Sequence, residues 1–171
     1  LEELGGAAQV LAGGTDVMIQ LDRREIRPTT LVHIEKIDEL TEINANGDVR
    51  IGSLVTHSKL SESMLEMGYS SVAEAAATVG GWQTQAVGTI GGNVCNASPA
   101  ADVVPPLLVH DATVTLQSTK GERNLSLDEF IVGRRATKRR PDELLTAVTL
   151  VGPKEISGDV YLKVGRRAAM E

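Results

Sequence analysis

Hydrophobic positions in the first 55 residues occur in short blocks that glycines and polar residues separate. One apolar block ends at a pair of glycines, and a β-branched block follows further along the chain. Blocks of this kind are typical of strands, and helical spacing between them indicates a helix. Asn46-Gly47 is a strong hairpin signal and indicates that another strand follows. The predicted elements are a strand over 10–12, a helix over 16–21, and strands over 29–34 and 49–55.

From residue 56 the pattern changes to longer helical periods that alternate with strands. Ser71 and Glu74 have the spacing of a capping box, and Asp102 stands where it can cap a helix. Together the elements predict an α+β fold with two lobes, over residues 1–55 and 56–150. The predicted helices cover 56–64, 71–79 and 102–109, and the predicted strands cover 89–94, 112–117, 122–125 and 144–150.

The remaining residues, 151–171, belong to neither lobe. Residues 151–158 contain glycine and proline among polar residues, which predicts a linker. The segment 161–171 begins like a strand and then runs into Arg166 to Met170, which favours a helix. Because the pattern stops in the middle of an element, we expect a further region to continue it.

Composition narrows the classes of function. The chain has 171 residues, of which 42% are hydrophobic and 23% are charged, as in an ordinary globular protein. No apolar run reaches the roughly 20 residues of a membrane helix. The formal net charge is −6 and aromatic residues make up 2%, so nucleic-acid binding is not expected. The dense basic run over residues 134–140 predicts a solvated loop, or else a docking patch for an acidic partner.

Cysteine and histidine content excludes several kinds of site. Cys95 is the single cysteine, so no disulfide forms within the chain, which suits the reducing cytoplasm. A cysteine-ligated iron–sulfur cluster needs several thiolates and is excluded. His33, His57 and His110 are scattered without ligand spacing, so no metal site is expected.

Two glycine-containing segments carry candidate chemistry. Ala12-Gly13-Gly14-Thr15-Asp16 follows a predicted strand, and its successive N–H groups near a helix start suit an anion. A plain strand–helix turn is the simpler interpretation of this segment taken alone. The second segment, Gly88 to Asp102, interleaves glycines with polar residues. A β-bulge followed by a loop is the alternative interpretation of this segment. Neither segment matches a nicotinamide Rossmann or Walker pattern, which disfavours those two kinds of site. The hypothesis is that the two segments together bind a large phosphorylated cofactor from both sides.

Five motifs in order make the chain resemble the FAD-binding (medium) subunits of the xanthine dehydrogenase and carbon monoxide dehydrogenase family of molybdenum hydroxylases. They are Leu11–Asp16, Arg50–His57, Gly88–Asn93, Cys95–Asp102 and Lys163–Arg167. The resemblance covers nearly the whole chain, and it implies FAD as the cofactor. It also implies a two-lobed fold of the vanillyl-alcohol oxidase type whose C-terminal domain is truncated here.

The resemblance implies a set of FAD-binding residues. One loop would wrap the FAD pyrophosphate and a second would approach it from the other lobe. Asp102 would bond toward the adenosine or ribityl part, and Leu145 and Lys163 would lie close to the cofactor. The first loop comprises Val10, Leu11, Ala12, Gly13, Gly14, Thr15, Asp16 and Val17. The second comprises Gly88, Thr89, Ile90, Gly91, Gly92 and Asn93.

The resemblance implies an electron-transfer role without a catalytic residue for substrate chemistry in this chain. Electrons would leave a molybdenum–pterin large subunit, cross a [2Fe–2S] small subunit, reach FAD here and pass to an external acceptor. A self-contained FAD-dependent oxidase or reductase on the same fold is the alternative, and a structural module without cofactor is a third. His57 is expected to pack or cap at a helix start rather than act as a base, and Cys95 to pack beside the glycine loop.

Overall fold

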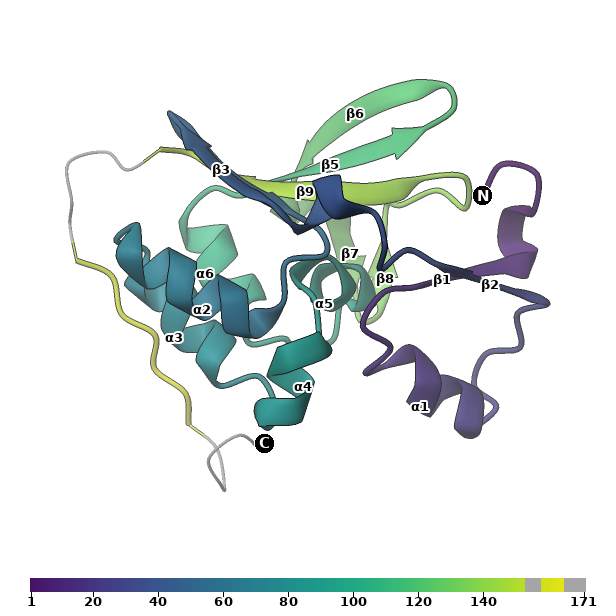
Figure 1. Ribbon diagram of the computed structural model, residues 1–171, viewed down its shortest axis with the longest axis horizontal. Coiled ribbons are helices and arrows are strands. Elements are labelled where there is room, and N and C mark those ends of the chain that lie inside the picture. Colours follow the sequence, from purple (N-terminus) through teal and green to yellow (C-terminus); the bar gives the residue numbers. More distant parts are fainter. Residues whose placement is uncertain (153–157, 165–171) are drawn as a thin grey trace.

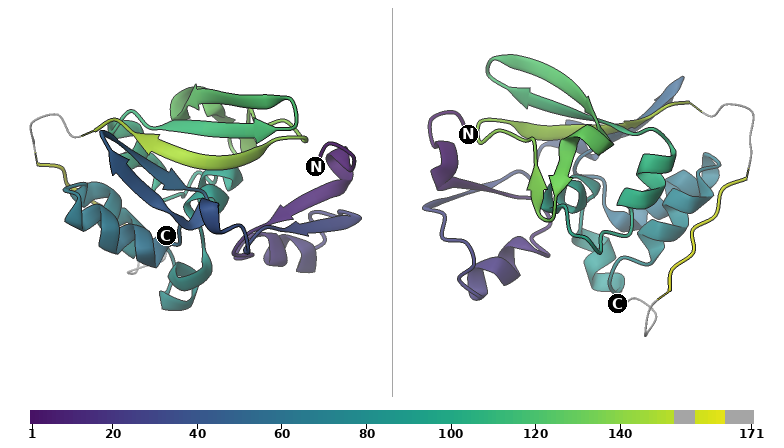
Figure 2. Two further views of the ribbon diagram at one scale, coloured as in Figure 1. Left: turned by 45° about the horizontal axis from the view of Figure 1, so that its top comes forward. Right: turned by 180° about the vertical axis from the view of Figure 1, so that it is seen from behind.

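The structure, a computed structural model, describes residues 1–152 and 158–164. A five-stranded antiparallel sheet forms the main layer, and most of the helices cover one of its faces (Figure 1). A smaller unit of two parallel strands and one helix stands beside the end of this layer (Figure 2). This mixed arrangement confirms that the fold combines helices and sheet.

The smaller unit is a strand–helix–strand crossover. Strand β1 (Ala8–Leu11) pairs in parallel with β2 (Thr30–His33), and helix α1 (Val17–Asp22) connects them. A 3₁₀ helix, η1 (Gly5–Ala7), precedes β1, and another, η2 (Asp38–Thr41), follows β2. All three elements predicted before residue 35 are therefore present, with ends that differ by a few residues. Ile34 of this unit is buried together with Leu40 and Leu54 in a small core that joins the unit to the rest of the chain.

The main sheet has the strand order β3-β4-β9-β5-β6 with antiparallel pairing throughout. Asn46 and Asp48 pair across Gly47, whose φ of +96° suits glycine, so the predicted hairpin is confirmed. Strand β4 ends at Gly52 rather than continuing to residue 55, because the chain turns there. The strands are β3 (Ile43–Asn46), β4 (Asp48–Gly52), β5 (Thr113–Ser118), β6 (Gly121–Ser126) and β9 (Leu144–Leu150).

Helices bury their apolar sides against this sheet and form the main core. Leu60, Ile90, Leu107 and Phe130 come from four different helices, and each is 0% exposed. A short hairpin of β7 (Ile131–Gly133) and β8 (Ala136–Thr137) extends from the last helix. The helices are α2 (His57–Glu66), α3 (Ser70–Ala77), α4 (Trp82–Val87), α5 (Ile90–Asn96), α6 (Val104–Val109) and α7 (Leu127–Phe130).

The predicted strand over residues 89–94 is wrong, because this segment is helix α5. Thr89 is extended and caps the helix, its hydroxyl accepting a hydrogen bond from the N–H of Gly92 at 3.1 Å. Gly91 packs so tightly against Ser53 that a Cβ would lie 2.6 Å from the Ser53 Cβ. Tertiary packing therefore decides the conformation of a segment whose β-branched residues favour a strand.

Two predicted helix caps are also wrong. Helix α3 begins at Ser70 without a side-chain cap from Tyr69, and the N–H groups of Ser70 and Ser71 donate to the carboxylate of Asp159 at 3.0 and 2.9 Å. Asp102 does not cap α6, whose N-cap Val103 provides no side-chain bond. Both capping positions were inferred from local spacing, whereas the carboxylate that caps α3 comes from a distant part of the chain.

Strands β3 and β4 precede residue 56 but belong by hydrogen bonding to the main sheet. The division into lobes at residue 55 stays a prediction. Residues 158–164 run beside α3 without forming a strand, contrary to the expectation for the start of segment 161–171. The helix predicted at residues 166–170 and most of the predicted linker lie outside the described residues.

Candidate cofactor-binding site

A cavity of about 990 Å³ lies where the β1–α1 loop, the start of α5 and strand β9 come together. Its size suits a bound cofactor, since such pockets typically measure about 300–1,000 Å³. Every residue predicted for the site lines this cavity except Leu11, Gly88 and Ile90. Ile90 is instead buried in the main core, and Gly88 packs against Thr84 and His57.

The β1–α1 loop presents unused backbone donors to the cavity. Gly14 has a φ of +74°, which turns the chain sharply after β1. Among the described residues, none accepts a hydrogen bond from the N–H groups of Gly13, Gly14, Thr15 or Asp16. Gly13 also lies against the carbonyl of Val87, where a side chain would not fit. The loop is therefore held close to α4 while its donors remain available to an anion.

The start of α5 contributes a surface rather than donors. Its N–H groups are already used, because Ile90 donates to the carbonyl of Val55 and Gly91 to that of Ser53, both at 2.9 Å. Gly92 differs, because a Cβ there would meet only the Thr89 hydroxyl, at 3.0 Å. The two glycines thus have different roles: Gly91 permits helix packing, and Gly92 leaves room in the cavity.

Three buried polar side-chain atoms have no partner in the described part of the chain: Ser53 Oγ, His57 Nδ1 and Asn93 Oδ1. All three residues line the cavity. An unsatisfied buried polar group is costly, so such atoms in one cavity indicate a polar ligand. His57, which was predicted to pack or cap at a helix start, does begin α2 and is 2% exposed.

Burial keeps two titratable side chains of the cavity, His57 and Cys95, neutral. It lowers the pKa of His57 to about 4, against a smaller opposing effect of Asp102, so the imidazole is uncharged near neutral pH. It also raises the pKa of the Cys95 thiol to about 11, so the thiolate is not formed. These groups offer hydrogen bonds rather than charge to a ligand.

Positive charge reaches the cavity from the β7–β8 hairpin. Arg135 and Arg139 line it, although the basic run containing them was predicted to be a solvated loop or a partner patch. Arg135 donates through Nη1 to Asn96 Oδ1 at 3.0 Å, and Arg139 donates to the carbonyls of Arg140 and Glu143. No local signal in the sequence shows that this hairpin folds back to α5.

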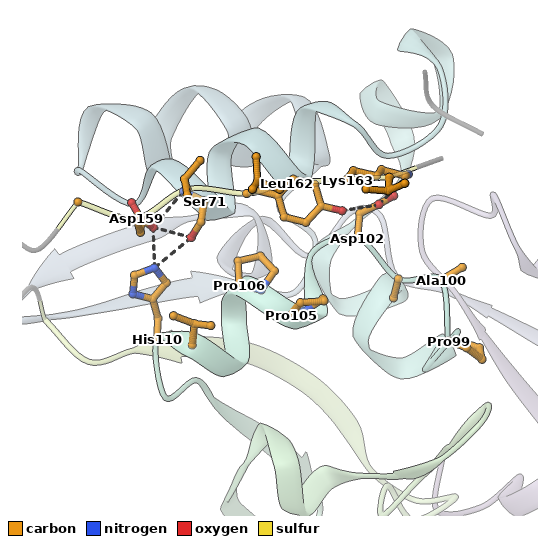
Figure 3. A pocket seen from close by; sticks show the side chains of 16 residues that line it. Ser71, Pro99, Ala100, Asp102, Pro105, Pro106, His110, Asp159, Leu162 and Lys163 are labelled. Atoms are coloured by element: carbon orange, nitrogen blue, oxygen red, sulfur yellow. Dashed lines mark hydrogen bonds and ion pairs between the residues drawn. The ribbon is translucent and has the colours of Figure 1, made fainter. Parts of the chain in front are cut away.

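The segment 158–164, which Figure 3 shows lining a neighbouring cavity, also brings Lys163 to the cofactor-sized cavity described above. Its ammonium lies 2.8 Å from Asp102 Oδ1, which also accepts a hydrogen bond from the Tyr161 hydroxyl at 2.7 Å. Asp102 and Lys163 are shared with a second cavity of about 1080 Å³, which lies between this segment and α6. The two predicted residues therefore meet, and they do so as an ion pair.

Asp159 anchors the other end of this segment (Figure 3). Its carboxylate accepts hydrogen bonds from Ser71 and lies 2.8 Å from His110 Nε2. Burial alone would raise the pKa of Asp159, but the hydrogen bonds from the Ser71 side chain and backbone and from His110 lower it to about 2. The segment is thus fixed by charge and by the α3 N-terminus.

No helix of the described residues is long and apolar enough to cross a membrane. Within the same residues, no three His, Cys, Asp or Glu side chains gather as a metal site.

Comparison with known proteins agrees with this geometry. The family model described as the FAD binding domain in molybdopterin dehydrogenase matches residues 1–151. The chain is 36% identical over 168 residues to the xanthine dehydrogenase FAD-binding subunit of Escherichia coli O157:H7, covering 96% of this chain and 58% of that protein. It is 31% identical over 166 residues to the nicotinate dehydrogenase FAD-subunit of Eubacterium barkeri, covering 94% and 56%.

A solved structure shares the fold. Carbon monoxide dehydrogenase from Hydrogenophaga pseudoflava superimposes with a TM-score of 0.93 at 26% identity, covering 99% of this chain and 60% of that one. The chain thus spans less than two thirds of the length of these relatives. The resemblance drawn from the five motifs is confirmed, and the chain belongs to the family of FAD-binding domains found in molybdopterin dehydrogenases.

Proposed function

We propose that the cavity between the β1–α1 loop and α5 binds FAD through the residues that line it. The observation that carries this is the combination, around one cavity, of N–H groups at Gly13–Asp16 and three buried polar atoms that have no partner in the described part of the chain. When bound, FAD supplies the redox chemistry, and the protein supplies position and polarity.

Each segment has its own part in this proposal. The N–H groups of Gly13–Asp16 donate to the pyrophosphate, and Gly92 leaves space beside it. Ser53, His57 and Asn93 offer neutral hydrogen-bonding groups. Leu145 contributes to the apolar wall of the cavity, and Asp102 and Lys163 form its ion pair.

For the whole protein we propose an electron-transfer subunit of a cytoplasmic molybdenum hydroxylase. The names of its relatives, which are dehydrogenase FAD-binding subunits, support this. Its partners would be a molybdenum–pterin large subunit and a [2Fe–2S] small subunit, and its electrons would pass to an external acceptor. The two-lobed fold would be of the vanillyl-alcohol oxidase type, and a further domain after residue 171 stays a prediction.

The flavin content of the purified full protein tests the binding proposal. One FAD per chain is expected, held without a covalent bond because the cavity is built from hydrogen-bonding groups. Acid precipitation should release all the flavin into the supernatant. Flavin that remains in the pellet would contradict non-covalent binding, and a protein that takes up no FAD would contradict the site itself.

A further inference from the structure

Among the described residues that line the cavity, Arg135 and Arg139 are the cations that form no ion pair. Lys163 is paired with Asp102 at 2.8 Å. Arg139 directs its Nη1 to two backbone carbonyls of its own turn. Arg135 forms no ion pair within the described residues, where its one side-chain hydrogen bond goes to a neutral amide oxygen, that of Asn96. Its charge is therefore not neutralised by the described part of the protein.

The backbone around Arg135 is held in an unusual conformation. Arg135 has a φ of +52°, and Ala97 at the end of α5 has a φ of +44°. The left-handed region is uncommon for residues other than glycine. The two residues are joined directly, because the Arg135 N–H donates to the Ala97 carbonyl at 2.9 Å. Strain of this kind tends to persist where surrounding contacts hold a functional side chain in place.

Asn96 fixes the direction of the guanidinium. Its Oδ1 accepts from Arg135 Nη1 at 3.0 Å and from Gln20 Nε2 at 3.4 Å. Gln20 lies on α1, immediately after the loop with the unused N–H donors. The chain of side chains from Gln20 through Asn96 to Arg135 therefore connects α1 with the β7–β8 hairpin, and all three residues line the cavity. Figures 1 and 2 show β8 beside the end of β1.

We propose that Arg135 binds the phosphate groups of the cofactor, held by Asn96 and Gln20 across the cavity. This rests on the proposed function, since FAD is the ligand that carries a diphosphate. A guanidinium has five N–H donors in a fixed fork that matches phosphate oxygens, and Asn96 occupies only one side of it. The diphosphate would then be bound from two sides, by the N–H groups of the β1–α1 loop and by Arg135 of the β7–β8 hairpin.

The test compares FAD with riboflavin, which lacks phosphate, in titrations of the full protein. Arg135→Gly removes the charge and suits the positive φ. It should weaken FAD binding about 10- to 100-fold, as expected for loss of a charge-assisted hydrogen bond, and leave riboflavin binding unchanged. Its FAD affinity should also depend less on salt than that of the wild type. Arg134→Gln, at an exposed neighbour outside the cavity lining, should change neither ligand.

A second variant separates ligand binding from a structural role. Asn96→Asp places a carboxylate beside Arg135, so it should neutralise the guanidinium and weaken FAD binding while keeping the connection to the hairpin. Unchanged or tighter FAD binding in this variant would overturn the proposal. So would equal losses for FAD and riboflavin in Arg135→Gly, or no loss for FAD. A wild-type protein that binds no FAD would instead overturn the proposed function, and this inference with it.

Discussion

At the scale of single residues, the site depends on buried polar side chains whose hydrogen-bonding atoms have no partner in the described part of the protein. His57 is the clearest example, because its Nδ1 has no partner in the described residues and its side chain lies inside the cavity wall. Such a residue stabilises the complex with a ligand more than it stabilises the protein alone. The unsatisfied polar group should therefore lower the stability of the ligand-free protein.

The pH dependence of stability tests the burial of His57. In the unfolded chain it binds a proton below its ordinary pKa of 6.5, whereas in the folded protein its pKa is about 4. The unfolded state thus binds more protons between these values, so stability falls as the pH drops from 6.5 to 4. The expected loss is about 3 kcal/mol, at roughly 1.4 kcal/mol per pKa unit. Urea denaturation at several pH values should show this slope, and His57→Gln should flatten it. An equal slope in that variant would contradict the interpretation.

At the scale of elements, the segment 158–164 is held by contacts at both ends rather than by strand pairing. Asp159 binds the start of α3, and Lys163 pairs with Asp102 at the cavity. The backbone N–H of Tyr161 donates between them to the carboxylate of Glu74 at 3.0 Å. This attachment sets where Lys163 lies.

Asp159→Ala should release this segment and leave α3 without its cap. We expect a loss of about 1–3 kcal/mol in the free energy of unfolding, together with faster proteolysis near residues 158–164. The effect of Asp159 should persist down to about pH 4 and disappear as the pH falls through its pKa of about 2. Asp111→Asn is the control, because Asp111 is exposed and its φ of +50° suits asparagine. An Asp159→Ala protein as stable as the control would show that the anchor is not needed.

The local sequence pattern predicted those elements whose conformation is determined by their own residues. The hairpin at Asn46-Gly47 and the strand over residues 144–150 were confirmed. The helix α5 was missed, because its conformation depends on Gly91 fitting against Ser53. The role of Asp159 was missed as well, because the helix it caps lies far away in the sequence.

The candidate site divides in the same way. The glycines of the β1–α1 loop were found because a turn before a helix has a local signature. Arg135 was not, because it reaches the cavity only through the contact of the β7–β8 hairpin with α5. Ser53 was missed for a related reason, since a buried serine becomes informative only once its missing partner is seen.

At the scale of the whole molecule, the proposal assigns substrate chemistry to other subunits. The isolated FAD-loaded protein should therefore not be reduced by aldehydes, purines, N-heterocycles or carbon monoxide. Anaerobic flavin bleaching is the measurement, with an artificial reductant as the positive control. Bleaching should appear with an organic substrate only after the partner subunits are added. Rapid bleaching by the isolated protein would favour a self-contained oxidase or reductase.

The position of the cofactor is tested most directly by a pair of glycine variants. Gly92 and Gly133 both lack positive φ, but Gly92 lines the cavity and Gly133 is exposed with nothing near its Cβ position. Gly92→Val fills cavity space, which typically costs about 1–3 kcal/mol on overpacking, so FAD should bind about tenfold more weakly or worse. Thermal unfolding without FAD should show that the variant is folded, and Gly133→Val should bind FAD as the wild type does. Wild-type FAD affinity in a folded Gly92→Val protein would contradict the placement of FAD in this cavity.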